Sequence, residues 1–103
     1  ARRATLGMAR TGGLSGNGSG DIFLAFSTAN PGAAAETGAT ALTWLPNGDL
    51  TPFFDATVEA TEEAIVNALV AATTMTGIDG HTAYTLPHDQ LRALLTKYGR
   101  LSK

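Results

Sequence analysis

One serine in this sequence has neighbours whose types and spacing could support chemistry. The segment 15–21 reads SGNGSGD, with three alternating glycines and Ser19 between the last two. The apolar run IFLAFST follows directly. Such a loop is typical of a phosphate site, of a nucleophilic serine in a hydrolase turn, or of a self-cleaving bond. A glycine-rich connection with a solvated serine is the alternative without chemistry.

Two of these chemistries do not fit the spacing. A phosphate loop follows a strand and opens a helix, whereas this loop precedes the apolar run, and no lysine follows a glycine. The serine turn of α/β-hydrolases, G-x-S-x-G, needs glycines two places on either side of the serine. Around Ser19 these places hold Asn17 and Asp21, and around Ser15 they hold Gly13 and Asn17. A solvated loop and a self-cleaving bond remain.

Cleavage before Ser19 has a specific physical basis. Gly18 and Gly20 leave the preceding carbonyl unshielded and permit strained backbone angles, which would favour attack by the Ser19 hydroxyl. The resulting ester would hydrolyse and free the amine of Ser19. An α-amino group has an unperturbed pKa of about 7.7–8.0, so it can transfer protons at neutral pH.

Strands are predicted to follow this loop and to position its serine. Residues 1–11 predict the last turns of a helix, which the pair Gly12-Gly13 ends. The segment 21–28 is apolar on both faces and predicts a strand covered on both sides. Residues 41–45 predict a second strand, and 50–54 its continuation as a hairpin after the turn signal PNGD.

Two helices are predicted in the second half. The first covers 55–75, with Asp55 as its N-cap and Gly77 as its C-terminal stop. The second runs over 87–98 and ends at Gly99. Strands first and helices afterwards favour an α+β or layered α/β unit.

Composition narrows the class of protein. The 103 residues are 44% hydrophobic and only 16% charged, whereas about a quarter of the residues are charged in an ordinary soluble domain. We therefore expect a subunit or a piece whose surface another chain covers. The net charge of −2 and the sparse basic residues do not suggest nucleic-acid binding, and no apolar stretch is long enough to span a membrane. No histidine pair has metal-ligand spacing.

Three blocks of the sequence resemble one known family. ARTGGLSGNGSGDIFLAFSTAN closely resembles the self-cleavage region of the DmpA-type aminopeptidases, a group with L-aminopeptidase/D-esterase and β-peptidyl aminopeptidase members. VEATEEAIVNAL, residues 58–69, and DGHTAYTLPHDQLRALL, residues 79–95, agree in order and spacing. The resemblance covers almost the whole chain.

The resemblance implies a site. A precursor of this family cuts itself at a Gly–Ser bond, which here corresponds to Gly18–Ser19, and Ser19 then becomes the N-terminal nucleophile. The family also uses a hydroxyl residue and a glutamate two positions apart, which correspond to Thr57 and Glu59. Threonine departs from the serine that is commoner at the first of these positions. In the predicted helix both residues fall in the first turn, where N–H groups stabilise a carboxylate.

The resemblance also implies the rest of the molecule. The fold would be α/β (α+β), the C-terminal part of a layered α/β/β/α sandwich of the DmpA/ornithine acetyltransferase type, completed by an N-terminal subunit. Residues 1–18 would be the tail of that subunit and 19–103 the nucleophile-bearing subunit. We expect a cytoplasmic hydrolase without cofactor or metal, active only with the N-terminal subunit, in a homo-oligomer of such heterodimers. It would act on short peptides, amides or esters.

Two other functions stay open at this point. The first is an uncleaved, non-enzymatic scaffold or assembly subunit, which the presence of residues 1–18 ahead of Ser19 favours. The second is a related self-processing acyltransferase of the ornithine acetyltransferase type. That group uses a threonine nucleophile, so the serine in GNGSGD argues against it.

Overall fold

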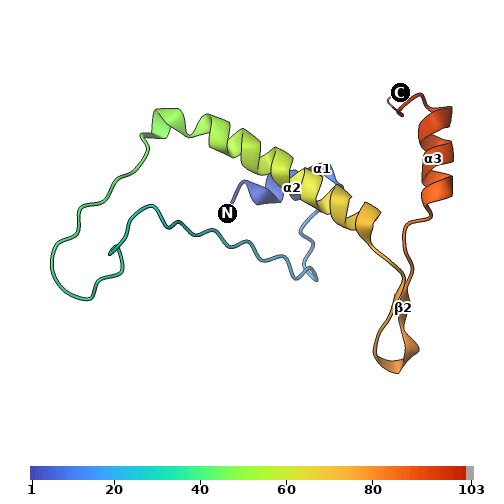
Figure 1. Ribbon diagram of the computed structural model, residues 1–103, viewed down its shortest axis with the longest axis horizontal. Coiled ribbons are helices and arrows are strands. Elements are labelled where there is room, and N and C mark those ends of the chain that lie inside the picture. The colour runs from blue at the N-terminus through green and yellow to red at the C-terminus, as the bar shows by residue number, and fades with distance from the viewer. Residues whose placement is uncertain (102–103) are drawn as a thin grey trace. The chain divides into compact units, whose positions relative to one another are not determined.

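The computed structural model describes residues 1–101. The chain divides into two compact units, Ala1–Glu62 and Glu63–Lys103. Helices α1, α2 and α3 and the hairpin of β1 and β2 form its regular structure (Figure 1). The mixture of helices and strands agrees with the expected α/β composition.

Helix α1 spans Ala4–Arg10 and confirms the helix predicted at the N-terminus. Gly12 follows it with φ +92°, and its N–H donates to the carbonyl of Ala9 at 3.0 Å. A left-handed glycine directly after a helix is the usual way to end it. The glycine pair therefore ends the helix as predicted.

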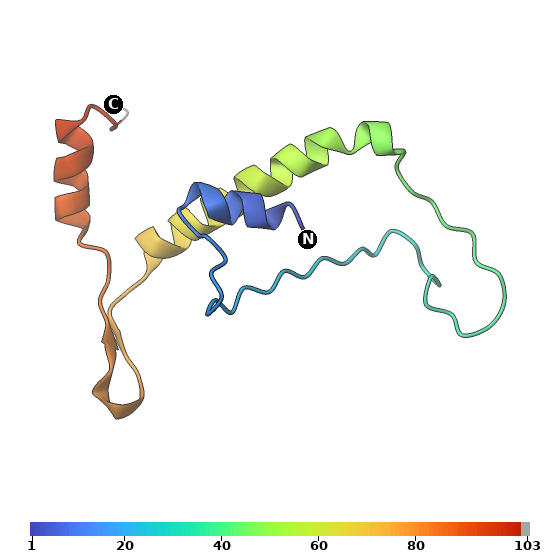
Figure 2. The same cartoon turned by 180° about the vertical axis from the view of Figure 1, so that it is seen from behind.

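Helix α1 lies beside helix α2, Thr51–Ala71, in both views (Figures 1 and 2). The contact is made at Gly7, which is buried. A Cβ atom on Gly7 would lie 2.5 Å from the carbonyl oxygen of Val58 and 2.6 Å from Cβ of Thr61. Val58, 8% exposed, is the one buried hydrophobic side chain in the described part of the chain. The close approach of the helices thus requires a glycine at position 7.

Polar contacts flank this helix pair. Arg10 Nη1 donates to Glu62 Oε2 at 3.0 Å, and the guanidinium of Arg3 lies 4.3 Å from the ring centroid of Phe54. Arg10 belongs to α1 and Arg3 immediately precedes that helix, whereas both partners belong to α2. An exposed ion pair contributes at most about 1 kcal/mol, so these contacts orient the helices more than they stabilise them.

The strands predicted over 21–28, 41–45 and 50–54 are not formed among residues 1–101. The chain from Leu14 to Pro46 has no helix or strand, and its large apolar side chains are exposed except for the half-buried Phe23. Ile22, Leu24 and Phe26 are 90%, 87% and 87% exposed. A strand needs a partner for its backbone N–H and C=O groups, and no described segment pairs with this one.

The side chain of Asn30 forms two hydrogen bonds with the backbone of Thr43, across the loop after the first predicted strand. Its side-chain Oδ1 accepts from the N–H of Thr43 at 2.8 Å, and its Nδ2 donates to the carbonyl of Thr43 at 3.1 Å. The carboxamide therefore satisfies both backbone groups of Thr43, as a neighbouring strand would. The second predicted strand region is thus contacted by a side chain that lies two residues after the first.

Helix α2 begins earlier than predicted, so the hairpin over 50–54 and the cap at Asp55 are both wrong. A short 3₁₀ turn, Asn47–Asp49, leads into it, and the N–H groups of Phe53 and Phe54 donate to Leu50 at 3.1 Å. Pro52 lies in the first turn, where a missing N–H costs nothing. The helix therefore starts at Thr51, and Asp55 lies within it.

Helix α2 also ends earlier than predicted, at Ala71. The hydroxyl of Thr85 donates to the carbonyl of Ala72 at 2.6 Å and satisfies one of the free carbonyls at the helix end. The chain then enters strand β1, Met75–Thr76. Gly77 has φ −98° and is not a helix-ending glycine, which corrects the prediction made for it.

Strand β1 pairs antiparallel with β2, Thr82–Ala83, in a small hairpin. Its turn has Asp79 at φ +56° and Gly80 at φ +76°, and the N–H of His81 donates to Ile78 at 3.2 Å. Two successive left-handed residues of the type Asp-Gly form a type I′ turn, which matches the twist of a hairpin. No strand was predicted between the two helices of the second half.

Helix α3, His88–Lys97, confirms the second predicted helix and its end at Gly99. Gly99 has φ +62°, and its N–H donates to Thr96 at 3.1 Å. The N–H of Arg100 donates to Leu95 at 2.8 Å. These two hydrogen bonds form a Schellman motif, in which the left-handed glycine satisfies the last carbonyls of the helix.

Candidate active site

The Gly18–Ser19 bond lies at the end of a hydrogen-bonded turn. The N–H of Ser19 donates to the carbonyl of Gly16 at 2.8 Å, so residues 16–19 form one β-turn. All residues of this turn are exposed. A Cβ atom on Gly16, Gly18 or Gly20 would meet nothing within 4 Å. The glycines therefore leave space around the Gly18 carbonyl, and its attack by Ser19 stays a prediction.

The expected backbone strain at Gly18 and Gly20 is absent. Neither glycine has a left-handed φ; within the loop that conformation belongs to Ser15, at φ +46°. A turn closed by a bond between its first and fourth residues does not need positive φ at its central positions. These glycines contribute open space at the bond and no backbone strain.

Asp21 is the residue that contacts the hydroxyl of Ser19. Ser19 Oγ donates to Asp21 Oδ2 at 2.8 Å, and both side chains are exposed. Asp21 was not among the catalytic residues predicted from the sequence. Its position two residues after the serine, past a glycine that adds no bulk, is the signal that could have identified it.

Thr57 and Glu59 lie within α2 and not in its first turn, which corrects the prediction. Thr57 is half-buried, and its Oγ1 donates to the carbonyl of Phe53 at 2.6 Å. Glu59 is exposed and forms no side-chain hydrogen bond or ion pair within residues 1–101. Side chains two positions apart on a helix do not face each other. The helix therefore separates the hydroxyl and the carboxylate that were expected to act together.

The described hydrogen bonds do not join Ser19 to Thr57 or Glu59. In residues 1–101, the hydroxyl of Ser19 bonds to Asp21 and that of Thr57 to a backbone carbonyl. Of the expected constellation, the structure thus brings together the two residues of the bond, Gly18 and Ser19, and adds Asp21 beside them.

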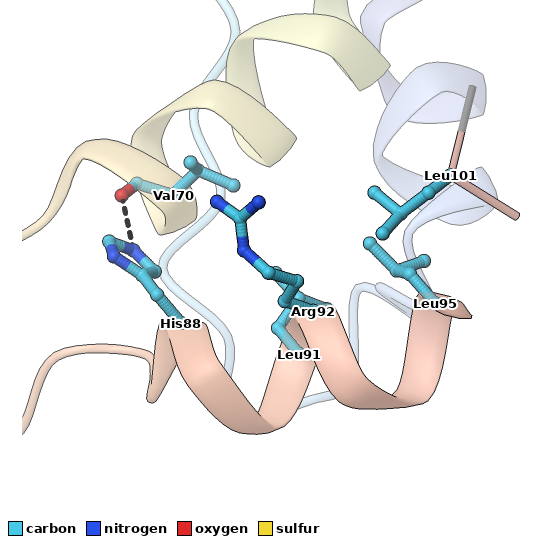
Figure 3. Close-up of a pocket in the computed structure, with 6 residues that line it drawn as sticks. All are labelled: Val70, His88, Leu91, Arg92, Leu95 and Leu101. Atoms are coloured by element: carbon cyan, nitrogen blue, oxygen red, sulfur yellow. Dashed lines mark hydrogen bonds between the residues drawn. The ribbon is translucent and has the colours of Figure 1, made fainter. Parts of the chain in front are cut away.

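A separate hollow lies in the second unit, between the end of α2, helix α3 and the residues after it (Figure 3). Its volume is about 260 Å³. It is lined mainly by apolar side chains, namely Val70, His88, Leu91, Arg92, Leu95 and Leu101. His88 Nε2 lies 2.9 Å from the carbonyl oxygen of Val70 and so links α3 to the end of α2. Ligand pockets are usually larger, about 300–1,000 Å³, and this one has no nucleophilic side chain.

Two further properties bear on function. Within residues 1–101, no three His, Asp or Glu side chains gather as the ligands of a metal ion would. None of the described helices combines the length and the apolar character that crossing a membrane requires.

Known proteins match the part of the chain that holds this candidate site. The model of peptidase family S58 matches residues 1–83, which include the turn, Thr57 and Glu59. The β-peptidyl aminopeptidase BapA of Sphingosinicella microcystinivorans is 52% identical over 103 residues, which are 99% of this chain and 26% of that protein. BapA of Sphingosinicella xenopeptidilytica is 40% identical over 97 residues, 92% of this chain and 24% of that protein. The chain thus spans about a quarter of the length of these curated relatives.

Two solved structures resemble the fold. The PH0078 protein from Pyrococcus horikoshii OT3 is 50% identical with a TM-score of 0.87, over 98% of this chain and 29% of that one. The L-aminopeptidase D-Ala-esterase/amidase of Ochrobactrum anthropi is 40% identical with a TM-score of 0.83, over 99% of this chain and 29% of that one. The latter is described as a prototype of the serine aminopeptidases and a variant of the Ntn hydrolase fold. Because the family model covers most of the chain and these relatives agree with it, the chain belongs to peptidase family S58, the DmpA-type aminopeptidases.

Proposed function

We propose that this chain is the nucleophile-bearing part of a self-processing serine aminopeptidase. The precursor cuts itself between Gly18 and Ser19, and Ser19 then hydrolyses short peptides, amides or esters at their N-terminal residue. The observation that carries the proposal is the turn that exposes the Gly18–Ser19 bond, in a chain belonging to a peptidase family. Relatives named as aminopeptidases support the reaction class.

In turnover, the Ser19 hydroxyl oxygen attacks the carbonyl carbon of the substrate. The free amine of Ser19 accepts the hydroxyl proton and passes it to the amine that departs from the substrate. The acyl group of the substrate then remains on Ser19 Oγ as an ester. Water then attacks this ester and releases the acid. Thr57 and Glu59 orient the nucleophile and its amine. Because they lie on different sides of α2, each acts on its own partner and not as a directly bonded pair.

The N-terminal subunit of the precursor would cover the exposed apolar face of this chain and supply the oxyanion donors. Ile22, Leu24 and Phe26 lie two positions apart, so in an extended chain they share one face. A contiguous apolar face of this kind marks an interaction surface. An N-terminal subunit that adds strands to this segment would cover the face and complete a layered α/β/β/α sandwich. It would also supply the oxyanion donors, each of which is worth about 10²–10³ in rate. Homo-oligomers of the resulting heterodimer would cover further surface.

N-terminal sequencing and intact mass of the full-length product test this proposal. We expect a fragment that begins Ser19-Gly20-Asp21, together with activity on amino-acid p-nitroanilides. The Ser19→Ala variant should stay uncut and lack this activity, whereas Ser15→Ala, in the same loop, should be cut normally. An uncut, inactive wild-type protein would instead support a scaffold. Acyl transfer to an amine in preference to water would support an acyltransferase.

A further inference from the structure

We propose that Asp21 is a catalytic residue of the self-cleavage step, in which its carboxylate accepts the hydroxyl proton of Ser19. This inference rests on the proposed cut between Gly18 and Ser19. It gives the precursor a base for its own processing, distinct from the amine that serves the mature enzyme. Its basis is the hydrogen bond from Ser19 Oγ to Asp21 Oδ2, at 2.8 Å.

The uncut chain needs a base that the mature enzyme does not need. Before cleavage, the nitrogen of Ser19 is an amide nitrogen and cannot accept a proton. Its N–H donates to the carbonyl of Gly16 at 2.8 Å. The amine that takes part in turnover therefore exists only after the bond has been cut. A serine hydroxyl is a weak nucleophile without a base beside it, so another group must take its proton in the precursor.

Asp21 is the group in position to do so. Its carboxylate oxygen lies within hydrogen-bond reach of the hydroxyl, which is the first requirement for a general base. The hydroxyl of Thr57 donates a hydrogen bond to a backbone carbonyl, and Glu59 has no described contact with Ser19. Within residues 1–101, the ion pair found is between Arg10 and Glu62, so no described cation holds the Asp21 carboxylate.

The proposed step is balanced in protons and bonds. Ser19 Oγ forms a bond to the carbonyl carbon of Gly18 while its proton passes to Asp21 Oδ2. The bond between that carbon and the nitrogen of Ser19 then breaks, and Asp21 returns the proton to the departing nitrogen. The products are an ester between Gly18 and Ser19 Oγ and a free amine on Ser19. Water hydrolyses the ester to the Gly18 carboxylate and the Ser19 hydroxyl.

The turn assists this transfer. Gly20 separates the two reacting side chains without adding bulk, and a Cβ atom there would meet nothing within 4 Å. The hydrogen bond to Gly16 fixes the nitrogen that leaves. Asp21 follows Ser19 by two residues, so one carboxylate serves both the oxygen that attacks and the nitrogen that departs.

The first test compares self-cleavage rates of full-length precursors. Asp21→Asn keeps the size of the side chain and an oxygen that accepts a hydrogen bond, but it cannot carry the proton. We expect it to slow the appearance of the fragment beginning at Ser19 by about 10²-fold or more, the usual effect of losing a general base. Thermal unfolding compared with the uncut Ser19→Ala precursor reports whether the fold is kept. Cleavage of Asp21→Asn at the wild-type rate would overturn the inference.

Chemical rescue separates proton transfer from a structural role. In Asp21→Ala, added formate should restore cleavage in proportion to its concentration, because a small carboxylate can occupy the vacated position. Formate should not accelerate the wild type and should not rescue Ser19→Ala. An Asp21→Ala precursor that is cut at the wild-type rate, or a slow one that formate does not accelerate, would contradict the proton role. A wild-type precursor that is never cut would instead refute the proposed function itself, so the two failures are distinguishable.

Discussion

Substitution of Gly7 by alanine tests the packing of α1 on α2. Alanine is the better helix former, and in an exposed helix the change would stabilise the protein by about 0.8–1 kcal/mol. Here the added methyl would lie 2.5 Å from the carbonyl oxygen of Val58 and 2.6 Å from Cβ of Thr61. The two effects have opposite signs, so the sign of the measured change identifies the dominant one.

Crowding should outweigh the gain in helix propensity. Carbon atoms in contact prefer separations of about 3.5–4.0 Å, so α1 would have to move away by about 1 Å. Neither close atom can give way, because one belongs to the backbone of α2 and the other is the branched Cβ of Thr61. Overpacking of this kind costs about 1–3 kcal/mol. With the gain in helix propensity subtracted, we expect Gly7→Ala to lower the free energy of unfolding by up to about 2 kcal/mol.

Urea unfolding of the full-length protein in an uncut Ser19→Ala background measures this change. Gly48→Ala is the matched control, because a Cβ atom there meets nothing within 4 Å and its φ is not left-handed. That control should leave stability unchanged or raise it by about 0.4–1 kcal/mol. A Gly7→Ala protein that is more stable than its parent would refute the packing argument. If the chain is cut at Gly18–Ser19, α1 and α2 belong to different products, and the same substitution should also weaken their association.

Two further predictions concern the site and the exposed segment. Glu59→Gln should lower kcat/KM for an amino-acid p-nitroanilide by about 10²-fold or more if the carboxylate manages protons, while Glu63→Gln on the same helix should not. Equal effects of the two substitutions, measured by steady-state kinetics, would argue for a general charge effect. Phe26→Asp should reduce the yield of assembled, cleaved protein in size-exclusion chromatography, because it places a charge on the apolar face, whereas Phe26→Tyr should assemble normally. Unaltered assembly of the aspartate variant would show that this face stays in solvent.

Helices were predictable where all of their signals are local. The end of α3 at Gly99 and the end of α1 at Gly12 follow from left-handed glycines, whose effect depends only on the adjacent turn. The start of α2 was misjudged because residues 50–54 were assigned to a hairpin strand, although Pro52 in the middle of that segment suits the first turn of a helix. The backbone bonds from Phe53 and Phe54 to Leu50 decide between the two, and composition does not reveal them.

The strands were predicted from apolar composition, which reports burial and not pairing. The segment 21–28 has the composition of a strand covered on both faces, yet Ile22 is 90% exposed and no described segment pairs with it. The partners of a strand are set by residues far away in sequence. This chain spans about a quarter of the length of its relatives, and the composition of the segment does not indicate which residues would pair with it.

The candidate site also has a part formed by neighbouring residues and a part that depends on residues far away in sequence. Ser19, Gly18 and Asp21 lie within four consecutive residues, and the turn brings them together without help from any other element. Spacing alone left a self-cleaving bond and a solvated loop open, and the predicted cut at Gly18–Ser19 comes from the family resemblance. Thr57 and Glu59 lie on a helix that separates their side chains, and neither contacts Ser19. If cleavage depends on the turn and turnover on the helix, Asp21→Asn should impair the first and Glu59→Gln the second. Self-processing would then be a property of this local turn, whereas substrate hydrolysis would need the assembled protein.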